Sequence, residues 1–426
     1  MDARLNQQAQ IEREHPAVVL GMFDTGLGVG RSLGRNGIKV FGFDMVKNIG
    51  FYSKFINAEL CPDPLKEEDE FIDFLVDFSR KQKNKPVLLI TADYFLNAIS
   101  RNRNLLKEHF LFNIAAHNII ETVSDKFKQT QMAADAGILV PKTYFPENLK
   151  EACRVAENIS YPAFIKGQNV NQWRVKLCTK GFVVKSKEEF IGHYEKIFSN
   201  EVKAIAQEVI PGPDTNHFKV CSYISKEGEI LLNFTLQKIR QIPVRFGVGS
   251  CVKSIHFPEL LDTGIRFFKH INYTGVGSAE FKVNERDGKL YLIELNQRYW
   301  QQNSLSEKCG MNFPLYDYLH VTGQNPAPSS HFFENIKWVS INIDWSSYRE
   351  YGKKGELSFP EWIRSLNGQK VFSDFARDDL KPAQYRFMHY VKRGLVKAKN
   401  GFVKYTKKGQ KRKGRRIPSK APLFKS

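Results

Sequence analysis

Two short apolar runs in this chain carry acidic residues where strand interiors usually have none. They extend over residues 276–283 and 290–295, and each alternates and is bounded by turn residues, which predicts two antiparallel strands joined by a tight loop. A three-residue loop with Gly288 in the left-handed conformation would pair Glu280 with Glu294, whereas a two-residue turn would put these acids on opposite faces of the sheet. Both registers fit the sequence.

In the first register, the side chains of Glu280 and Glu294 start about 5 Å apart, and a divalent cation would relieve their repulsion. Asn296 and Arg298 follow on the same face in steps of two residues, and they supply a neutral oxygen ligand and a planar donor suited to phosphate or carboxylate. Oxygen ligands beside a phosphate-binding group suit magnesium. The alternative from spacing alone is a hairpin whose acids point into solvent.

The length and composition indicate a globular protein. With 426 residues and 42% hydrophobic content, the chain can form two or three compact units. No apolar run reaches the length that spans a bilayer, and residues 1–16 do not resemble a signal peptide, so we expect a cytoplasmic protein. The six cysteines are scattered without a C-x-x-C pair, which favours reduced thiols over a zinc site or a disulfide framework.

The net charge of +19 is concentrated at the C-terminal end. Residues 392–426 hold fourteen Lys or Arg and no acid, which leaves +5 for the rest of the chain. A disordered, solvated extension is one interpretation of this tail. Contact with an anionic partner, either the cytoplasmic membrane leaflet or RNA, is the other, and the sequence favours neither.

The N-terminal part opens with a strand over residues 17–22, a glycine-rich segment and a second strand. Asp44 stands where a dinucleotide-binding fold has its ribose-binding acid, but Arg31 occupies the third glycine position of that fingerprint. We therefore interpret the glycines as serving a tight turn and disfavour a nicotinamide cofactor. Thr91 and Asp93 follow a predicted parallel strand and are candidates for the substrate side, although helix capping is the commoner role for such an Asp.

The segment from Gly275 to Trp300 resembles the metal-binding hairpin of the ATP-grasp enzymes, in particular the carboxylate–amine ligase branch that includes D-aspartate ligases. In that motif Glu280, Glu294 and Asn296 hold the metal, and Arg298 is catalytic. The resemblance implies an α/β (α+β) protein with a Rossmann-like domain over residues 17–122 and an ATP-grasp domain of two α+β subdomains over residues 123–324. The resemblance weakens beyond residue 324, where Pro326 and Pro328 mark a boundary. We expect a small C-terminal α/β unit without a catalytic motif over residues 325–391, a disordered N-terminus over residues 1–16 and a disordered basic tail over residues 392–426.

The resemblance also implies a nucleotide site. Lys126, in the first turn of a predicted helix, matches a nucleotide-contacting basic position, and Lys166 matches the lysine of the α- and β-phosphates. A lysine at the end of an apolar strand can direct its charge at a phosphate while its stem stays packed. Asp214 matches the acid that accepts from the ribose hydroxyls. The hinge that holds adenine corresponds to Gln207, Glu208, Val209 and Ile210, with Gln207 in place of the usual acid.

Two further segments each allow two interpretations. Lys238 and Arg240 are two residues apart on a predicted strand, where they would bind the transferring phosphate or a substrate carboxylate, or else form a basic edge that discourages sheet pairing. The resemblance favours a catalytic role for both. The family's glycine-rich lid is replaced by a segment containing Asn169, Asn171, Gln172, Trp173 and Arg174, whose side chains would substitute for backbone donors or serve the acceptor.

The implied activity is that of an ATP-dependent, ADP-forming carboxylate–amine ligase. Mg-ATP, with manganese as an alternative ion, would lie between the two subdomains while a small carboxylate forms an acyl phosphate that an amine then attacks. By analogy, the substrates would be an amino acid and a cell-envelope or polysaccharide precursor, the enzyme a homodimer, and the tail a contact at the inner face of the membrane. The alternative is an ATP-binding regulatory or scaffold protein docked by its basic tail.

Overall fold

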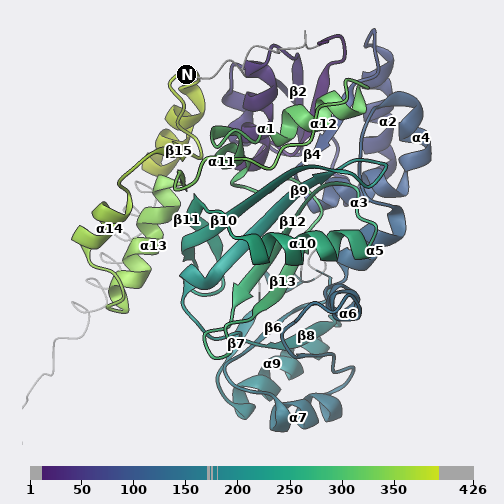
Figure 1. The fold of residues 1–426 in the computed structure, drawn as a ribbon. Helices are drawn as coiled ribbons and strands as arrows, with labels where there is room; N and C mark the ends of the chain where they lie inside the picture. Colours follow the sequence, from purple (N-terminus) through teal and green to yellow (C-terminus); the bar gives the residue numbers. More distant parts are fainter. Residues whose placement is uncertain (1–11, 170–172, 174–175, 180, 393–426) are drawn as a thin grey trace, which may run out of the picture.

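The computed structural model describes residues 12–169, 173, 176–179 and 181–392. These residues form three β-sheets with helices packed around them (Figure 1). Within this described part, no helix has the length and apolar character needed to cross a membrane. The basic tail from residue 393 onward and the predicted lid residues Asn171, Gln172 and Arg174 lie outside the described residues.

The N-terminal sheet is parallel and has the strand order β3-β2-β1-β4. The chain leaves β1 to form β2 and β3 on one side and returns to form β4 on the other, so the direction of winding reverses between β1 and β4. At such a switch point, ligands bind at the carboxyl ends of the strands. The elements are β1 (Ala17–Leu20), α1 (Asp24–Arg35), β2 (Val40–Asp44), η2 (Ile49–Tyr52), β3 (Ile56–Leu60), α2 (Glu68–Arg80), β4 (Val87–Ile90), α3 (Asp93–Arg101) and α4 (Arg103–His109).

The turn between β1 and α1 has the role predicted for its glycines. Gly21 has a φ of 93°, and a Cβ atom on Gly26 would lie 1.9 Å from the Gly21 carbonyl oxygen, so the turn requires glycine at both positions. Asp44 is buried, and its Oδ2 accepts a hydrogen bond from the Met22 backbone N–H at 2.7 Å. This bond fixes the loop at the carboxyl end of β1.

The central sheet has seven strands in the order β13-β12-β9-β10-β11-β14-β15. Helix α10 packs on β9 and β10, α12 contacts β4 and the central strands, and α13 packs on β10 and β11. The elements are α5 (His117–Ser124), β9 (His217–Ile224), β10 (Ile230–Ile242), β11 (Val248–Ser254), α10 (Pro258–His270), β12 (Gly275–Val283), β13 (Leu290–Asn296), α11 (Asn303–Lys308), α12 (Phe313–Val321), β14 (Lys337–Val339), α13 (Ile341–Lys353), α14 (Phe359–Ser365) and β15 (Lys370–Phe372).

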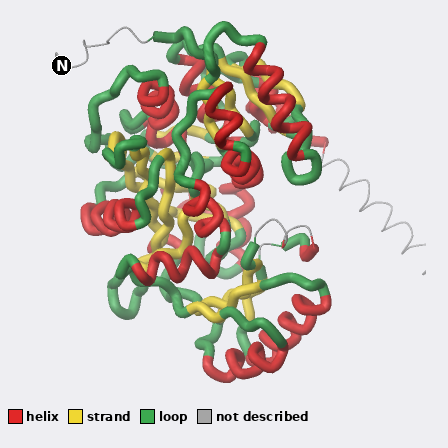
Figure 2. Tube along the Cα trace, turned by 90° about the vertical axis from the view of Figure 1, so that its right-hand side faces the viewer, coloured by secondary structure: helices red, strands yellow, loops and turns green. Residues whose placement is uncertain are grey.

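The third sheet belongs to a smaller subdomain at the lower end of the molecule (Figure 2). Trp173, predicted in the lid, is buried there beside Phe182, with ring centroids 5.7 Å apart. A Cβ atom on Gly167 would lie 2.4 Å from the Trp173 Cβ, so this side chain packs directly on a strand of the sheet. The elements are α6 (Lys126–Asp135), β5 (Thr143–Tyr144), α7 (Leu149–Asn158), β6 (Ala163–Gly167), β7 (Phe182–Val184), α9 (Lys187–Ser199) and β8 (Ala204–Glu208), and the strand order is β5-β8-β6-β7. The following η3 (Asp214–Asn216) packs on β10 of the central sheet.

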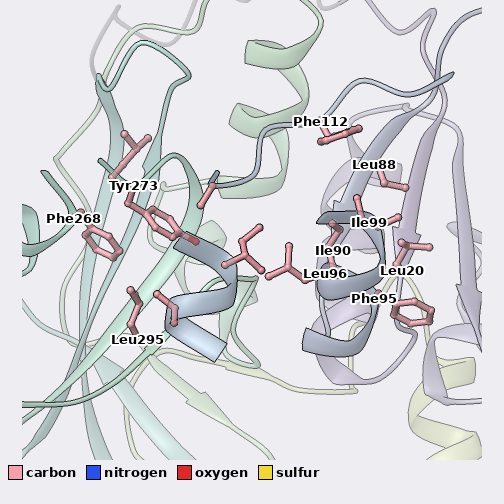
Figure 3. Packing of buried hydrophobic residues seen from close by; sticks show 14 of the residues in the cluster. Leu20, Leu88, Ile90, Phe95, Leu96, Ile99, Phe112, Phe268, Tyr273 and Leu295 are labelled. Atoms are coloured by element: carbon pink, nitrogen blue, oxygen red, sulfur yellow. The ribbon is translucent and has the colours of Figure 1, made fainter. Parts of the chain in front are cut away.

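One hydrophobic cluster joins the N-terminal sheet to the central sheet (Figure 3). Leu20, Ile90 and Phe95 enter it from the N-terminal side, and Phe268 and Leu295 from the central side. Because burial of apolar area is the main favourable term in folding, this cluster fixes the carboxyl ends of β1 and β4 relative to β13.

Both ends of the described chain contact the rest of the molecule. Residues 12–16 were expected in a disordered N-terminus, but the Tyr318 hydroxyl donates to the His15 carbonyl at 2.9 Å and Arg13 Nε donates to the Asn36 carbonyl at 2.7 Å. The C-terminal region is also integrated, because β14 pairs with β11 and β15 pairs with β14. The region after residue 325 therefore extends the central sheet.

Asp317 on α12 gives the interior a pH-sensitive group. The residue is buried, and the Tyr299 hydroxyl donates to its Oδ2 at 2.8 Å. Burial raises the pKa of this carboxyl to about 7 despite the hydrogen bonds from Tyr299 and Tyr223. The folded state therefore favours the protonated form, whereas the unfolded chain ionises near its ordinary value.

We predict that this group reduces stability as the pH rises toward 7. Because the folded pKa of Asp317 lies above the unfolded one, its contribution is complete below about pH 4 and should fall by about 2–3 kcal/mol between pH 5 and pH 8. Asp317→Asn should remove this dependence, so urea unfolding should show the variant gaining on the wild type by that amount across the interval. A difference that is the same at both pH values would contradict the prediction.

Candidate functional site

The predicted hairpin of β12 and β13 is present, and Glu280 is paired with Glu294. The expected three-residue loop is wrong, because the Asn284 N–H donates to the Lys289 carbonyl at 3.0 Å and leaves four residues, 285–288, in the loop. Gly288 is left-handed, with a φ of 70°. The two acids face each other because a β-bulge shifts the register by one residue between Phe281 and Glu280.

Three basic side chains from β9 and β10 surround the carboxylate of Glu280. Lys238 forms an ion pair with it, Lys219 Nζ lies 3.5 Å from its Oε2, and His217 Nδ1 lies 3.6 Å from its Oε1. Burial by itself would raise the pKa of Glu280, but Lys238, Lys219 and His217 hold it well below its usual range. Glu280 is therefore an ionised group within a basic surrounding.

Glu294 is also held as a carboxylate by lysines, and these come from the smaller subdomain. Lys126 Nζ at the start of α6 lies 2.7 Å from Glu294 Oε1. Burial opposes ionisation, yet Lys126 and Lys166 lower the pKa of Glu294 to about 2. The pKa of Lys166 on β6 falls to about 8 because of burial, while Glu294 and Glu280 act in the opposite direction. The carboxylates of Glu280 and Glu294 in the central sheet therefore interact with Lys126 and Lys166 of the smaller subdomain.

The segment after Glu294 carries the other predicted groups toward the N-terminal sheet. Asn296 ends β13 opposite Ser278 and, two residues beyond Glu294, belongs to the same strand face. Arg298 Nε donates to Asp93 Oδ1 at 2.8 Å. Asp93 begins α3 just after β4, so this ion pair connects the acid pair with the carboxyl end of the N-terminal sheet.

Arg240 does not join this cluster, which corrects its predicted placement beside Lys238. The ladder between β10 and β11 changes register after Lys238, and the two side chains have different partners. Arg240 Nε and Nη2 donate to the two carboxylate oxygens of Asp344 on α13, at 2.9 and 2.8 Å. Both members of this pair are buried, and Trp362 Nε1 donates to the same carboxylate at 2.8 Å. The contacts of Arg240 are those of a structural ion pair.

Asp214 is likewise occupied within the protein rather than open to a ribose. Gln241 Nε2 donates to its Oδ1 at 2.7 Å, and the Arg245 N–H donates to its Oδ2 at 2.9 Å. The Tyr351 hydroxyl donates to the same Oδ2, and the residue is buried. These donors link η3 to β10 and α13. The contacts of Asp214 are therefore structural, which corrects its predicted role at the ribose.

The predicted adenine hinge lies at the end of β8. Gln207 is buried, and its Nε2 donates to Thr143 Oγ1 at 2.9 Å. Glu208 Oε1 accepts a bond of 3.3 Å from the Ser160 N–H. Val209 and Ile210 follow the strand. Adenine recognition by these four residues stays a prediction.

His217 and Lys219 are site residues that the sequence reading missed. They are two residues apart on β9, and Lys219 pairs directly with Glu280 in the ladder with β12. Both ring nitrogens of His217 are buried without a hydrogen-bond partner among the described residues. Their spacing of two residues is visible in the sequence, but the contact between β9 and β12 bridges more than 50 residues of chain.

Comparison with known proteins yields one family model and two curated relatives. Residues 245–315 match the model described as the ATP binding domain of the carbamoyl-phosphate synthase L chain. The chain is 23% identical over 284 residues to D-aspartate ligase of Enterococcus faecium, covering 62% of this chain and 66% of the relative. It is 24% identical over 322 residues to the carbamoyl phosphate synthase large chain of Pyrococcus furiosus, covering 68% and 29%. The match thus spans just under two thirds of the first relative and under one third of the second.

Solved structures share the architecture at low sequence identity. The biotin carboxylase domain of Hydrogenobacter thermophilus 2-oxoglutarate carboxylase, in complex with MgADP, ADP and bicarbonate, has a TM-score of 0.61 at 16% identity, covering 76% of this chain and 74% of that one. N5-carboxyaminoimidazole synthetase from Staphylococcus aureus complexed with ADP scores 0.58 at 13%, covering 75% and 80%. L-amino acid ligase from Bacillus licheniformis scores 0.57 at 14%, covering 75% and 78%. At these identities the likeness shows a common fold.

We predict that Arg240 stabilises the fold. Arg240→Ala should lower the free energy of unfolding by about 3–5 kcal/mol, because it leaves the buried Asp344 carboxylate without its cation. Urea denaturation measures this change. Arg245→Ala is the matched control, since it breaks the more exposed pair with Glu356 and should cost less than about 1 kcal/mol. Equal effects of the two substitutions would refute the assignment.

Proposed function

This chain is an ATP-grasp protein, and from that premise we propose that it is an ADP-forming ligase that joins a small carboxylate to an amine. The observation that carries the proposal is the pair Glu280 and Glu294, which face each other in the hairpin with Lys238 of the same sheet and Lys126 of α6 beside them. Two ionised acids in contact with several cations suit a ligand that itself combines a metal cation with phosphates. D-aspartate ligase and L-amino acid ligase, among the similar proteins, are consistent with this class of reaction.

The donor set fits Mg²⁺ better than a metal with an all-protein shell. Within the described residues, no group of three or more His, Cys, Asp or Glu side chains could hold a metal ion. Glu280, Glu294 and Asn296 would instead supply part of the shell, with phosphates and water supplying the rest, as is usual for Mg²⁺. The ion would offset phosphate charge as the γ-phosphoryl group transfers. A complex with MgADP in the biotin carboxylase domain supports ATP and magnesium as the ligands here.

The protein's own groups would act mainly by positioning and electrostatics. Lys126 would exchange its carboxylate partner Glu294 for phosphate oxygens, Lys166 would bind phosphate near it, and Lys238 would remain beside Glu280. A substrate carboxylate oxygen attacks the γ-phosphorus, the bond to the β-phosphate oxygen breaks, and ADP leaves. The amine then attacks the acyl carbon, loses a proton and displaces inorganic phosphate. Arg298 would orient the acyl phosphate oxygens during this second step.

The substrates that we propose are an amino acid as the carboxylate and an amine on a cell-envelope or polysaccharide precursor. The named activity of the E. faecium relative supports the amino acid. Asp93 at the start of α3 would face this substrate, because Arg298 reaches the same place from the hairpin. The candidate Thr91 is instead buried, and its Oγ1 donates to the carbonyls of Leu20 and Gly21 at 2.7 and 2.9 Å. We also propose that the enzyme is a homodimer.

The test is magnesium-dependent phosphate release from ATP with pairs of carboxylates and amines. Glu294→Gln should reduce turnover by about 100-fold or more while leaving the melting temperature within a few degrees, because it removes a ligand of the metal that binds the transferring phosphate. Glu285→Gln is the control, since this exposed acid lies in the loop of the same hairpin. Full activity of Glu294→Gln would sink the metal assignment. ATP binding without release for any pair would favour the regulatory alternative.

We also propose that the C-terminal end places the protein at an anionic membrane surface. In the helix of residues 381–392, Phe387, Met388 and Val391 are exposed, and 387 and 388 each lie about one turn from 391. Lys392 is the last described residue of this helix, and thirteen more basic residues follow in the sequence. Apolar side chains next to lysines and arginines suit a bilayer that contains anionic lipid.

Flotation with lipid vesicles tests this location. The full chain should bind vesicles that contain phosphatidylserine, and binding should fall about 10-fold or more when residues 393–426 are deleted, because each basic residue near the surface contributes about 1 kcal/mol. Vesicles of neutral lipid are the control. Equal binding by the full and truncated chains, or retention on RNA at an ionic strength where vesicles release the protein, would count against the membrane.

A further inference from the structure

We infer that the helix of residues 381–392 belongs to the substrate side of the site, where its Arg386 is a positioning residue that acts through Asp24. Arg386 forms an ion pair with Asp24, and Asp24 accepts a hydrogen bond from the loop that carries Arg298. This inference rests on the proposed ligase function. It assigns part of the substrate site to a region well beyond the residues that match the family model.

The loop of residues 297–302 ties the acid pair to the carboxyl ends of β1 and β4. Arg298 reaches Asp93 after β4, and Gln301 Nε2 donates to Asp24 Oδ2 after β1, at 3.0 Å. Asn303 at the end of the loop donates to the Thr25 carbonyl at 3.1 Å. Because β1 and β4 flank the switch point of the N-terminal sheet, the loop lies where this fold class binds substrates.

Asp24 depends on Arg386 for its charge balance. Its side chain is 1% exposed, and that of Arg386 is 12% exposed. Burial raises the pKa of the Asp24 carboxyl, and the guanidinium of Arg386 opposes that rise. Arg386 Nε also lies 3.1 Å from Asp374 Oδ2. Removing this guanidinium would leave two neighbouring acids without their common cation, one of them the group that holds Gln301.

The C-terminal segment of residues 374–392 contacts the N-terminal domain through residues other than Arg386. Arg31 Nε lies 2.9 Å from Asp379 Oδ2 in a buried ion pair, and Arg35 Nε lies 2.8 Å from Asp378 Oδ2. The rings of Tyr52 and Tyr385 are stacked, with centroids 3.9 Å apart. Figure 1 shows this yellow-green segment next to the purple N-terminal domain. Loss of Arg386 alone would therefore leave the segment docked.

The proposed nucleotide contacts come from other elements, so the effect of Arg386 should be confined to the other substrates. Lys126 and Lys166 belong to α6 and β6 in the smaller subdomain. Arg298 and Asp93 lie on the side where Asp24 and Gln301 meet. A loop that loses its anchor at Gln301 should hold Arg298 less well and weaken binding of the carboxylate substrate before it weakens binding of ATP.

The experiment measures both Michaelis constants for full-length Arg386→Ala. We expect the constant for the carboxylate substrate to rise about 10-fold or more and that for ATP to change less than about twofold. Arg386→Lys should restore part of the loss because it keeps the charge. Arg35→Ala is the matched control, since it breaks the Arg35–Asp378 pair in the same contact and should leave both constants near wild type. Equal changes in both constants, or no change in either, would overturn the inference.

A second readout separates this inference from the proposed ligase activity. If the wild type releases no phosphate with any substrate pair, the ligase proposal fails, and hydrogen exchange still tests the role of Arg386. Backbone amides of residues 297–302 should exchange at least several-fold faster in Arg386→Ala than in the wild type or in Arg35→Ala. Unchanged exchange in this loop would overturn the positioning role.

Discussion

The repulsion between Glu280 and Glu294 is the constraint on which the arrangement of the site depends. Two acids paired across a ladder are unfavourable unless cations compensate them. The compensation comes from separate parts of the fold, with Lys238 on β10 beside Glu280 and Lys126 on α6 beside Glu294. Lys166 on β6 also acts on the second acid. The central sheet and the smaller subdomain therefore share one electrostatic centre.

Local rules predicted the parts of this centre that neighbours in sequence determine. Alternation and Gly288 predicted the hairpin but left two registers open, and glycine spacing predicted the turn after β1. The acids face each other only because of the β-bulge. The β-bulge in β13 was not predictable, since the extra residue is accommodated by packing against the rest of the sheet. Lys219 was missed for a related reason. The whole topology of the sheet determines that β9, which carries Lys219, lies beside β12.

The wrong placements of Arg240 and Asp214 both have their cause in the C-terminal region. Asp344 and Tyr351 on α13 take up these two groups, more than 100 residues along the chain. Prolines after residue 325 and the absence of a catalytic motif indicated a separate small unit. Strand pairing instead makes β14 and β15 the edge of the central sheet, so buried polar groups of that sheet find partners there.

The charged groups around Glu280 and Glu294 indicate which kind of ligand the site binds. Lys126, Lys219 and Lys238 contact the two acids, and Lys166 interacts with both electrostatically, so four lysines leave an excess of positive charge in a partly buried place. Such an excess is costly unless an anion offsets it, and a magnesium nucleotide, which keeps a net negative charge, supplies that anion. Its cation would meet the acids while its phosphates meet the lysines. The ion pairs seen in the structure would then be the arrangement in which the same groups neutralise one another until the nucleotide binds.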